Sequence, residues 1–161
     1  MRRYFFYRPT LMVCFSTLLY AQMNNPIRIC ALRVSFLEDS SLSTTGNGQF
    51  LMENEGTDCG EYTIDNVPHD RGYFQSQLIA LNAYFSSVSY GEFSVDLEGS
   101  EVYPLGENES FQLSKSMDYY NPYNDPDIQE KRLTQLFHEA LIESYNQGQI
   151  DFSRYDIIVV F

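Results

Sequence analysis

The pattern of apolar and polar residues changes its period once between residues 71 and 98. In residues 73–88 apolar side chains recur every three to four positions, which predicts an amphipathic helix. Asp70 is expected to cap its start, and Gly91 to end it in a left-handed conformation. In residues 92–98 the period falls to two, with Phe93, Val95 and Leu97 on one side, which predicts a half-buried strand.

Three further segments carry clear patterns. Residues 26–37 are apolar on both faces at first and alternate later, which predicts a strand whose far end reaches solvent. Asp125-Pro126-Asp127 is a typical helix start, and the helix is expected to run to about Gln147 with Gly148 as its cap. Its buried stripe is predicted to be Ile128, Leu133, Leu136, Phe137, Ala140, Leu141 and Ser144.

The last segment, residues 157–161, is wholly apolar and predicts a strand covered on both faces. The order strand, helix, strand, helix, strand indicates an α/β fold with a twisted mixed sheet packed on helices. Residues 102–105 are expected to close the second strand. Residues 38–70 and 106–125 are predicted loops, and residues 49–52 and 61–64 are a candidate hairpin in the first of them.

The amino-terminal 21 residues have the layout of a secretory signal. A start with three arginines precedes the apolar segment 10–21, and cleavage is expected after Ala21. The apolar segment is shorter than the roughly 20 residues of a membrane span. A membrane anchor, or a lipid on Cys14, is the alternative. Residues 22–161 then form one domain that is secreted or held at the cell surface.

The net charge of the chain limits the classes of partner that it can bind. The whole chain has a net charge of −12, and removal of residues 1–21 takes away three of ten basic residues and no acidic one, which leaves −15. Such a surface repels phosphate backbones and anionic membranes, so we expect neither nucleic-acid binding nor membrane binding after signal cleavage.

Cys30 and Cys59 are the cysteines of the mature chain. An exported pair could form a disulfide. The alternative, favoured by the apolar neighbours of Cys30 in its strand, is a pair of free thiols with Cys30 buried.

The nearest approach to a zinc motif is His138-Glu139, which has Ile142 where His-Glu-x-x-His needs its second histidine. We interpret it as a surface pair on a helix. The other histidine, His69, is expected to lie at a helix entry. No nucleophile elbow, phosphate loop or dinucleotide motif is present in the sequence, so no catalytic or metal-binding residue is assigned within this chain.

An oxygen-rich segment, residues 117–130, could hold calcium. Its candidate ligands are Asp118, Asn121, Asn124, Asp125, Asp127 and Glu130. The spacing is not that of an EF-hand, and helix capping also explains Asp125 and Asp127. Asn108-Glu109-Ser110 is a glycosylation sequon if the source is eukaryotic.

Five short sequence segments, or phrases, occur in a fixed order that resembles the order in one family. They are an apolar strand at 29–36, Arg71-Gly72-Tyr73-Phe74, Ser89-Tyr90-Gly91, Val102-Tyr103-Pro104, and Asp151-Phe152-Ser153-Arg154-Tyr155-Asp156 leading into the last strand. In this order they resemble the amino-terminal half of the catalytic domain of immune inhibitor A-like secreted zinc metallopeptidases, over most of residues 27–161.

The resemblance implies a zincin fold in which the His-Glu-x-x-His helix follows the final strand. Zinc would then polarise the scissile carbonyl, and the glutamate would act as general base. Because the chain stops on an apolar strand, we expect an amino-terminal fragment that is inactive alone. The alternatives are a secreted acidic interaction module that binds a protein or glycan through residues 106–125, and an inactive zincin relative.

Overall fold

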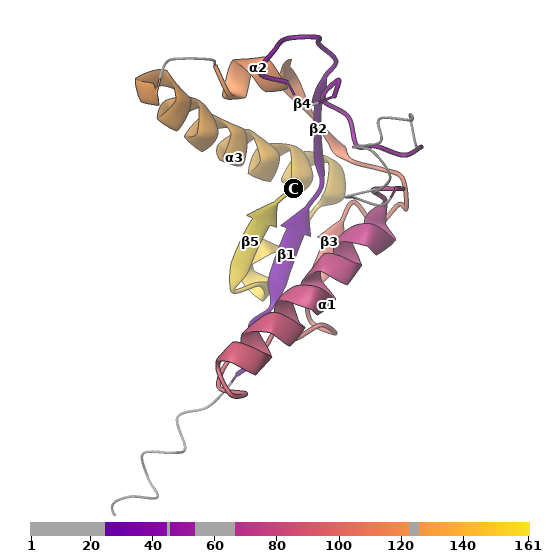
Figure 1. Cartoon of the computed structure of the whole chain (residues 1–161), viewed down its shortest axis with the longest axis vertical. Coiled ribbons are helices and arrows are strands. Elements are labelled where there is room, and N and C mark those ends of the chain that lie inside the picture. The colour runs from indigo at the N-terminus through magenta and orange to yellow at the C-terminus, as the bar shows by residue number, and fades with distance from the viewer. Residues whose placement is uncertain (1–24, 45, 54–66, 123–125) are drawn as a thin grey trace, which may run out of the picture.

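The computed structural model describes residues 25–44, 46–53, 67–122 and 126–161, and within them the chain has a mixed α/β fold (Figure 1). The predicted signal at 1–21 lies outside the described residues, as do Cys59 and residues 61–64. The elements in chain order are β1 (Ile29–Leu32), β2 (Val34–Leu37), α1 (Arg71–Val88), β3 (Glu101–Tyr103), β4 (Phe111–Ser116), α2 (Met117–Tyr120), α3 (Pro126–Gly148), a 3-10 turn (Phe152–Arg154) and β5 (Ile157–Val160).

The main sheet has three strands in the order β3-β1-β5, with β1 in the centre (Figure 1). Every strand pair that the structure describes is parallel, whereas the sequence predicted a mixed sheet. All four residues of β1 are buried, which agrees with their apolar run. A parallel central strand of this kind needs cover on both faces.

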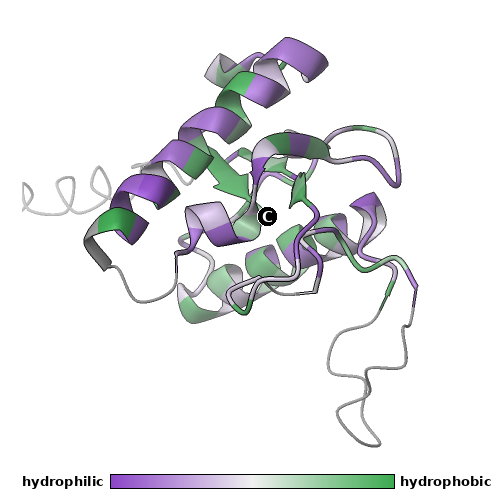
Figure 2. Ribbon diagram, turned by 90° about the horizontal axis from the view of Figure 1, so that it is seen from above, coloured by the Kyte–Doolittle hydropathy of each residue, from purple (hydrophilic) through white to green (hydrophobic). Residues whose placement is uncertain are grey.

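Two helices supply that cover from opposite sides (Figures 1 and 2). Ile29 and Ala31 pack with Phe74 and Leu78 of α1. The alternate β1 side chains, Cys30 and Leu32, pack with Ala140 of α3 and with Ile150 beyond it. The chain crosses from β1 to β3 through α1 and back past β1 to β5 through α3. These two connections run in opposite directions across the sheet. When both are right-handed, their helices lie on opposite faces of the sheet, as α1 and α3 do.

The first predicted strand, 26–37, is divided at Arg33. β1 pairs with β3 and β5, while β2 pairs in parallel with β4 in a separate two-stranded sheet. At Arg33 the chain changes its neighbouring strand from β3 to β4. The Arg33 N–H donates to Tyr103 O at 2.8 Å, and the Arg33 carbonyl accepts from Phe111 N at 2.9 Å. The prediction of one continuous strand was therefore wrong.

The prediction of a strand at residues 92–98 was also wrong. The structure has one bridge there, Ile27 to Val95, and the sheet strand is β3, six residues later. A turn explains the difference, since Asp96 accepts from Gly99 N at 2.9 Å and from Ser100 N at 2.9 Å. Val95 is buried as the alternation predicted, but Leu97 is 39% exposed.

The second predicted loop, 106–125, contains two elements that the sequence interpretation missed. β4 buries Phe111 and Leu113 and exposes Gln112 and Ser114, which is a strand with one buried face. The short helix α2 follows it and buries Tyr120. In the first loop, residues 49–52 form no strand.

Helix α1 confirms the prediction, because it starts at Arg71, directly after the expected cap. The Asp70 side chain accepts from Tyr73 N at 2.8 Å, so it is the N-cap. At the other end Gly91 has φ 83° and donates its N–H to Ser86 O at 2.8 Å. Only Phe74 and Leu78 of its predicted apolar face are buried, while Phe85 is 38% exposed.

Helix α3 confirms the predicted span, but its buried stripe differs. Ala140 and Ser144 are buried, and Leu136 and Leu141 are partly buried against the core. Ile128, Leu133 and Phe137 are 42%, 51% and 41% exposed. The residue that takes the left-handed backbone after α3 is Gln149, with φ 51°, and not Gly148.

β5 was predicted to be an interior strand and lies instead at the edge of the sheet in the part of the chain that the structure describes. Ile157 is 41% exposed, and the three following residues are partly exposed. Its apolar sequence reflects contacts on the two faces, with Ile158 in the cluster beside α3 and Val159 in the cluster beside α1. Among the described helices, none is both long and apolar enough to cross a lipid bilayer.

Replacement of the N-cap tests the start of α1. We expect Asp70→Ala to lower the free energy of unfolding by about 1 kcal/mol, because the Tyr73 N–H loses its acceptor. Asp70→Ser is the matched control, since a serine hydroxyl can accept the same bond and should restore most of the loss. Urea denaturation followed by circular dichroism measures both, and equal stability of Asp70→Ala and wild type would contradict the assignment.

Candidate functional site

A buried guanidinium organises the region beyond the carboxyl end of β3. Arg33 is 1% exposed and reaches the backbone of residues 104–107. Its Nη1 donates to Glu107 O at 2.8 Å, and its Nη2 donates to Pro104 O at 3.2 Å and to Gly106 O at 2.5 Å. Arg33, which directly follows β1, therefore fixes the loop that follows β3.

Backbone carbonyl groups stabilise the positive charge of Arg33. It forms no ion pair among the described residues, and its Nε has no hydrogen-bond partner there. Burial lowers the pKa of Arg33 from its ordinary value, and the nearby negative charge of Glu107 partly opposes this. Because guanidinium groups stay protonated in proteins, the three carbonyl bonds are charge-assisted and stronger than neutral ones.

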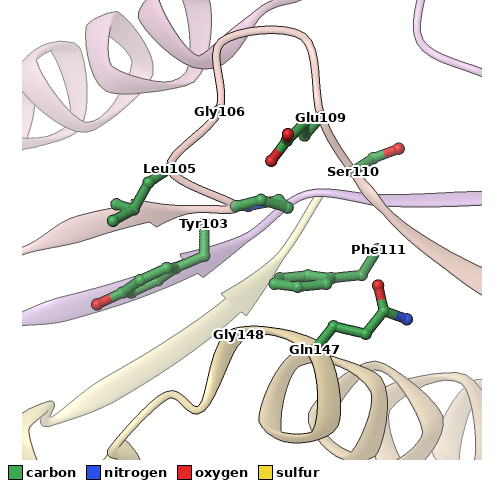
Figure 3. A pocket seen from close by; sticks show the side chains of 9 residues that line it. Tyr103, Leu105, Gly106, Glu109, Ser110, Phe111, Gln147 and Gly148 are labelled. Atoms are coloured by element: carbon green, nitrogen blue, oxygen red, sulfur yellow. The ribbon is translucent and has the colours of Figure 1, made fainter.

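The loop fixed by Arg33 forms one wall of a pocket of about 470 Å³ (Figure 3). The opposite wall is the end of α3, at Gln147 and Gly148. The complete lining is Tyr103, Pro104, Leu105, Gly106, Glu109, Ser110, Phe111, Gln147 and Gly148. Figure 3 shows Glu109 on the loop side of this hollow, across from Phe111 and Gln147. The pocket combines aromatic side chains with one carboxylate.

Two glycines permit this shape. A Cβ on Gly148 would lie 3.3 Å from the Phe111 ring and 3.2 Å from Ile150, which is tighter than ordinary contact. A Cβ on Gly106 would overlap the Glu109 side chain. Glycine at these positions lets the end of α3 approach Phe111 and lets the Glu109 carboxylate lie against the loop backbone.

Next to the pocket, Tyr103 and Tyr155 share a hydrogen bond of 3.0 Å between their hydroxyls. Burial, followed by the bond to Tyr103, raises the pKa of Tyr155. Burial also raises the pKa of the neighbouring Cys30 thiol to about 12, and Cys30 is a free cysteine, as the sequence interpretation favoured. A thiol with that pKa is protonated at neutral pH and is a poor nucleophile.

The His138-Glu139 pair is only half a surface pair, which corrects the sequence interpretation. His138 is exposed, but Glu139 turns toward β4 and α2. Its carboxylate accepts from Ser114 N at 2.6 Å and from the Tyr120 hydroxyl at 2.5 Å. Glu139 therefore connects three elements and is not free to act as a general base.

His69 lies two residues before α1, as its predicted place at the helix entry requires. Its N–H donates to Leu51 O at 2.8 Å, and its ring lies 4.6 Å from the ring of Tyr73. These contacts attach the segment before α1 to the helix itself.

The structure describes the side chains of only some predicted calcium ligands. The Asp118 carboxylate accepts from the hydroxyls of Ser41 and Ser43 at 2.7 and 2.6 Å, and the Asn121 oxygen accepts from Gln129 at 2.7 Å. Asn124 and Asp125 lie outside the described residues, and the side chain of Asp127 is not described. In the described part of the chain no three histidine, cysteine or acidic side chains gather as a metal site. Calcium binding stays a prediction.

The sequence interpretation missed the residues that build the pocket. Arg33 stood in a strand as an ordinary polar position, and Glu109 was noted only as part of a sequon. The one available signal was Arg33 inside an otherwise buried run, because a charged residue there must find buried partners. Nothing in the sequence indicated that these partners are carbonyls more than seventy residues away.

Replacing Arg33 tests its role as an organiser of the loop. We expect Arg33→Met to lower the free energy of unfolding by about 3 kcal/mol, because buried carbonyls lose their donors. Arg28→Met is the matched control, since Arg28 forms an exposed pair with Asp156 at 3.4 Å, and it should cost at most about 1 kcal/mol. Chemical denaturation measures both, and equal losses would refute the role.

The contacts of Glu139 predict a pH dependence of stability. Burial raises the pKa of its carboxyl, but the bonds from Tyr120 and Ser114 lower it more, so the pKa lies below the ordinary 4.5. A carboxyl whose pKa is lower in the folded state stabilises the fold at pH values above its pKa in the unfolded state. This contribution is lost as the pH falls through its pKa in the folded state.

We therefore expect the melting temperature of Glu139→Gln to depend less on pH between about 6 and 3 than that of the wild type. Glu130→Gln, an exposed position on the same helix, serves as the control and should keep the wild-type slope. Calorimetry across this pH range decides, and identical slopes for both variants would contradict the assignment.

The chain was also compared with known proteins. No protein-family model, no curated protein and no solved structure matches it. The functional argument below rests on the residues and contacts of the chain itself.

Proposed function

We propose that this chain forms the amino-terminal part of the catalytic domain of a secreted zinc-dependent metallopeptidase. In this proposal residues 22–161 are scaffold, exported through residues 1–21, and they carry neither the zinc ligands nor the general base. Its support is that four of the five phrases carrying the family resemblance, although far apart in sequence, lie in contact with one another.

Arg71 begins these contacts. Its Nε donates to Val102 O at 3.1 Å, its Nη2 pairs with the Glu101 carboxylate at 2.5 Å, and its N–H donates to Glu107 O at 2.9 Å. The phrase that opens α1 is thereby joined to the phrase that ends β3.

The first strand and the segment 151–161 join these contacts, whereas Ser89-Tyr90-Gly91 donates its backbone N–H groups to neighbouring residues of α1. The ring of Phe74 lies 4.8 Å from that of Phe161, and the Tyr103 hydroxyl bonds Tyr155. Asp156 accepts from Arg28 N at 2.9 Å, which fixes the entry of β5 beside β1. A catalytic site needs a rigid frame that holds its residues in one geometry, and this frame is the single observation that carries the proposal.

The two edges of the sheet differ in a way that fits the proposal. On the outer side of β3, the Val102 N–H donates to the Glu101 carboxylate at 3.2 Å and the Val102 carbonyl accepts from Arg71. These side chains occupy the edge and oppose the addition of a strand. β5 has no strand on its outer side among the described residues. A metal-binding segment after residue 161 would extend the sheet there.

The described residues do not themselves fit a zinc site. His69 and His138 belong to different elements, and Glu139 is held by Tyr120 and Ser114. We therefore derive no catalytic step from this chain.

A secreted interaction module is the second candidate, and the pocket in Figure 3 favours it. Residues 106–111 form much of the pocket lining, and they belong to the segment through which such a module would bind its partner. Calcium at residues 117–130 would be an additional cofactor of this candidate.

Isolation of the native protein tests the peptidase proposal. An antibody against the chain should recover from the culture medium of the source a protein heavier than the 18.7 kDa of this sequence. The recovered protein should cleave casein, lose this activity with 1,10-phenanthroline and regain it with zinc. The chain alone should neither cleave casein nor bind zinc tightly.

A secreted product no heavier than the chain and without chelator-sensitive cleavage would refute the peptidase proposal and favour the interaction module. Tight zinc binding by residues 22–161 alone would also contradict it.

A further inference from the structure

The pocket beyond β3 contains a carboxylate that no hydrogen bond engages. Among the described residues the Glu109 side chain forms no hydrogen bond and no close ion pair, and its electrostatic interaction with Arg33 acts through the loop. Nearby Glu107 differs, because its carboxylate accepts from Gly72 N at 3.2 Å. Glu109 is therefore the acidic group of the pocket that remains available to a ligand.

The other walls suit the alkyl part of a ligand with a positive head. Tyr103 supplies an aromatic ring, Pro104 and Leu105 supply apolar surface, and the buried Phe111 closes the base of the pocket. Aromatic rings attract ammonium and guanidinium groups through their quadrupole. Gln147 donates its amide N–H to Glu143 at 2.9 Å, which leaves its amide oxygen as a second acceptor for an N–H donor.

The positive charge closest to the loop does not serve an anionic ligand. Arg33 lies behind the loop, is 1% exposed, and donates to the carbonyls of residues 104, 106 and 107. An anion in the pocket would face the Glu109 carboxylate in a chain of net charge −12. A neutral ligand would desolvate that carboxylate without compensation.

The shape of the pocket is held by the backbone. Arg33 fixes the loop that carries Glu109, and Gly148 lets α3 end against the Phe111 ring. A volume of about 470 Å³ is within the range of small-ligand sites, and it accommodates a short alkyl chain with a planar cationic head. Such an arrangement requires little reorganisation on binding.

We propose that this pocket binds a guanidinium or ammonium group on a short alkyl chain, with Glu109 as counter-ion and Tyr103, Pro104 and Leu105 as walls. The group belongs to a free amine or to an arginine or lysine side chain of a peptide. The site is independent of the proposed peptidase function and exists whichever candidate function is correct.

Titration of the full chain with agmatine, followed by the amide signals of Gly106 and Gly148 in NMR spectra, tests the proposal. We expect saturable shifts with agmatine, weaker binding at high salt, and none with the neutral probe pentanamide or with glutarate. Glu109→Gln should weaken agmatine binding by at least about tenfold. Glu98→Gln, an exposed acid before the amino end of β3, should leave it unchanged.

Gly106→Ala provides a second variant that keeps the charge. Its Cβ displaces the Glu109 side chain, so it should weaken agmatine binding while Glu109 remains in the sequence. Circular dichroism and melting curves establish that the variants fold. Tighter binding of acetyl-Gly-Arg-Gly-amide than of agmatine would identify a peptide side chain as the source, and the reverse would identify a free amine.

Absence of saturable shifts with agmatine at about 20 mM, where even a millimolar site would be occupied, would overturn the proposal. Equal affinity of the wild type and Glu109→Gln, or equal binding of pentanamide and agmatine, would overturn it as well.

Discussion

The hydrogen bonds of the buried Arg33 guanidinium hold together the parts of this chain that a small parallel sheet could not join by itself. Taking a charged group out of water is costly, and the structure compensates with three backbone carbonyls from residues 104–107. Those carbonyls lie directly after β3, so the sheet, the loop and the pocket depend on one side chain. The same residue divides the first strand, because its backbone bonds lead the chain from β3 to β4.

The arrangement of the helices follows from the burial of β1. A strand with four buried residues needs apolar contacts on both faces, and α1 and α3 supply them from opposite sides. The chain reverses its direction of crossover at β1, and the two edges of the sheet then have different chemistry. Arg71 and Glu101 satisfy the outward groups of Val102 at one edge, while β5 forms the other.

The proposed function and the pocket concern largely separate parts of this frame. The contacts among the family-like phrases involve residues such as Arg71, Phe74 and Asp156, which join elements and leave no reactive group free. Glu109 has the opposite character, since it is exposed, forms no hydrogen bond among the described residues and lies against the loop at Gly106. Tyr103 belongs to both the scaffold and the pocket, since its hydroxyl bonds Tyr155 and its side chain lines the pocket, whereas Glu109 belongs to the pocket alone. The peptidase assignment remains a proposal that the scaffold supports.

The sequence by itself determined the features that depend on neighbouring residues. The 3.6-residue period predicted α1 and α3, and the cap at Asp70 followed from local chemistry, because helix signals span only a few positions. Only the tertiary structure decided the division at Arg33, the strand β4, the inward turn of Glu139 and the pocket around Glu109. Their partners lie far along the chain, since Glu139 bonds Ser114, 25 residues away, and the Arg33 carbonyl bonds Phe111, 111 − 33 = 78 residues away. No local pattern encodes such pairings.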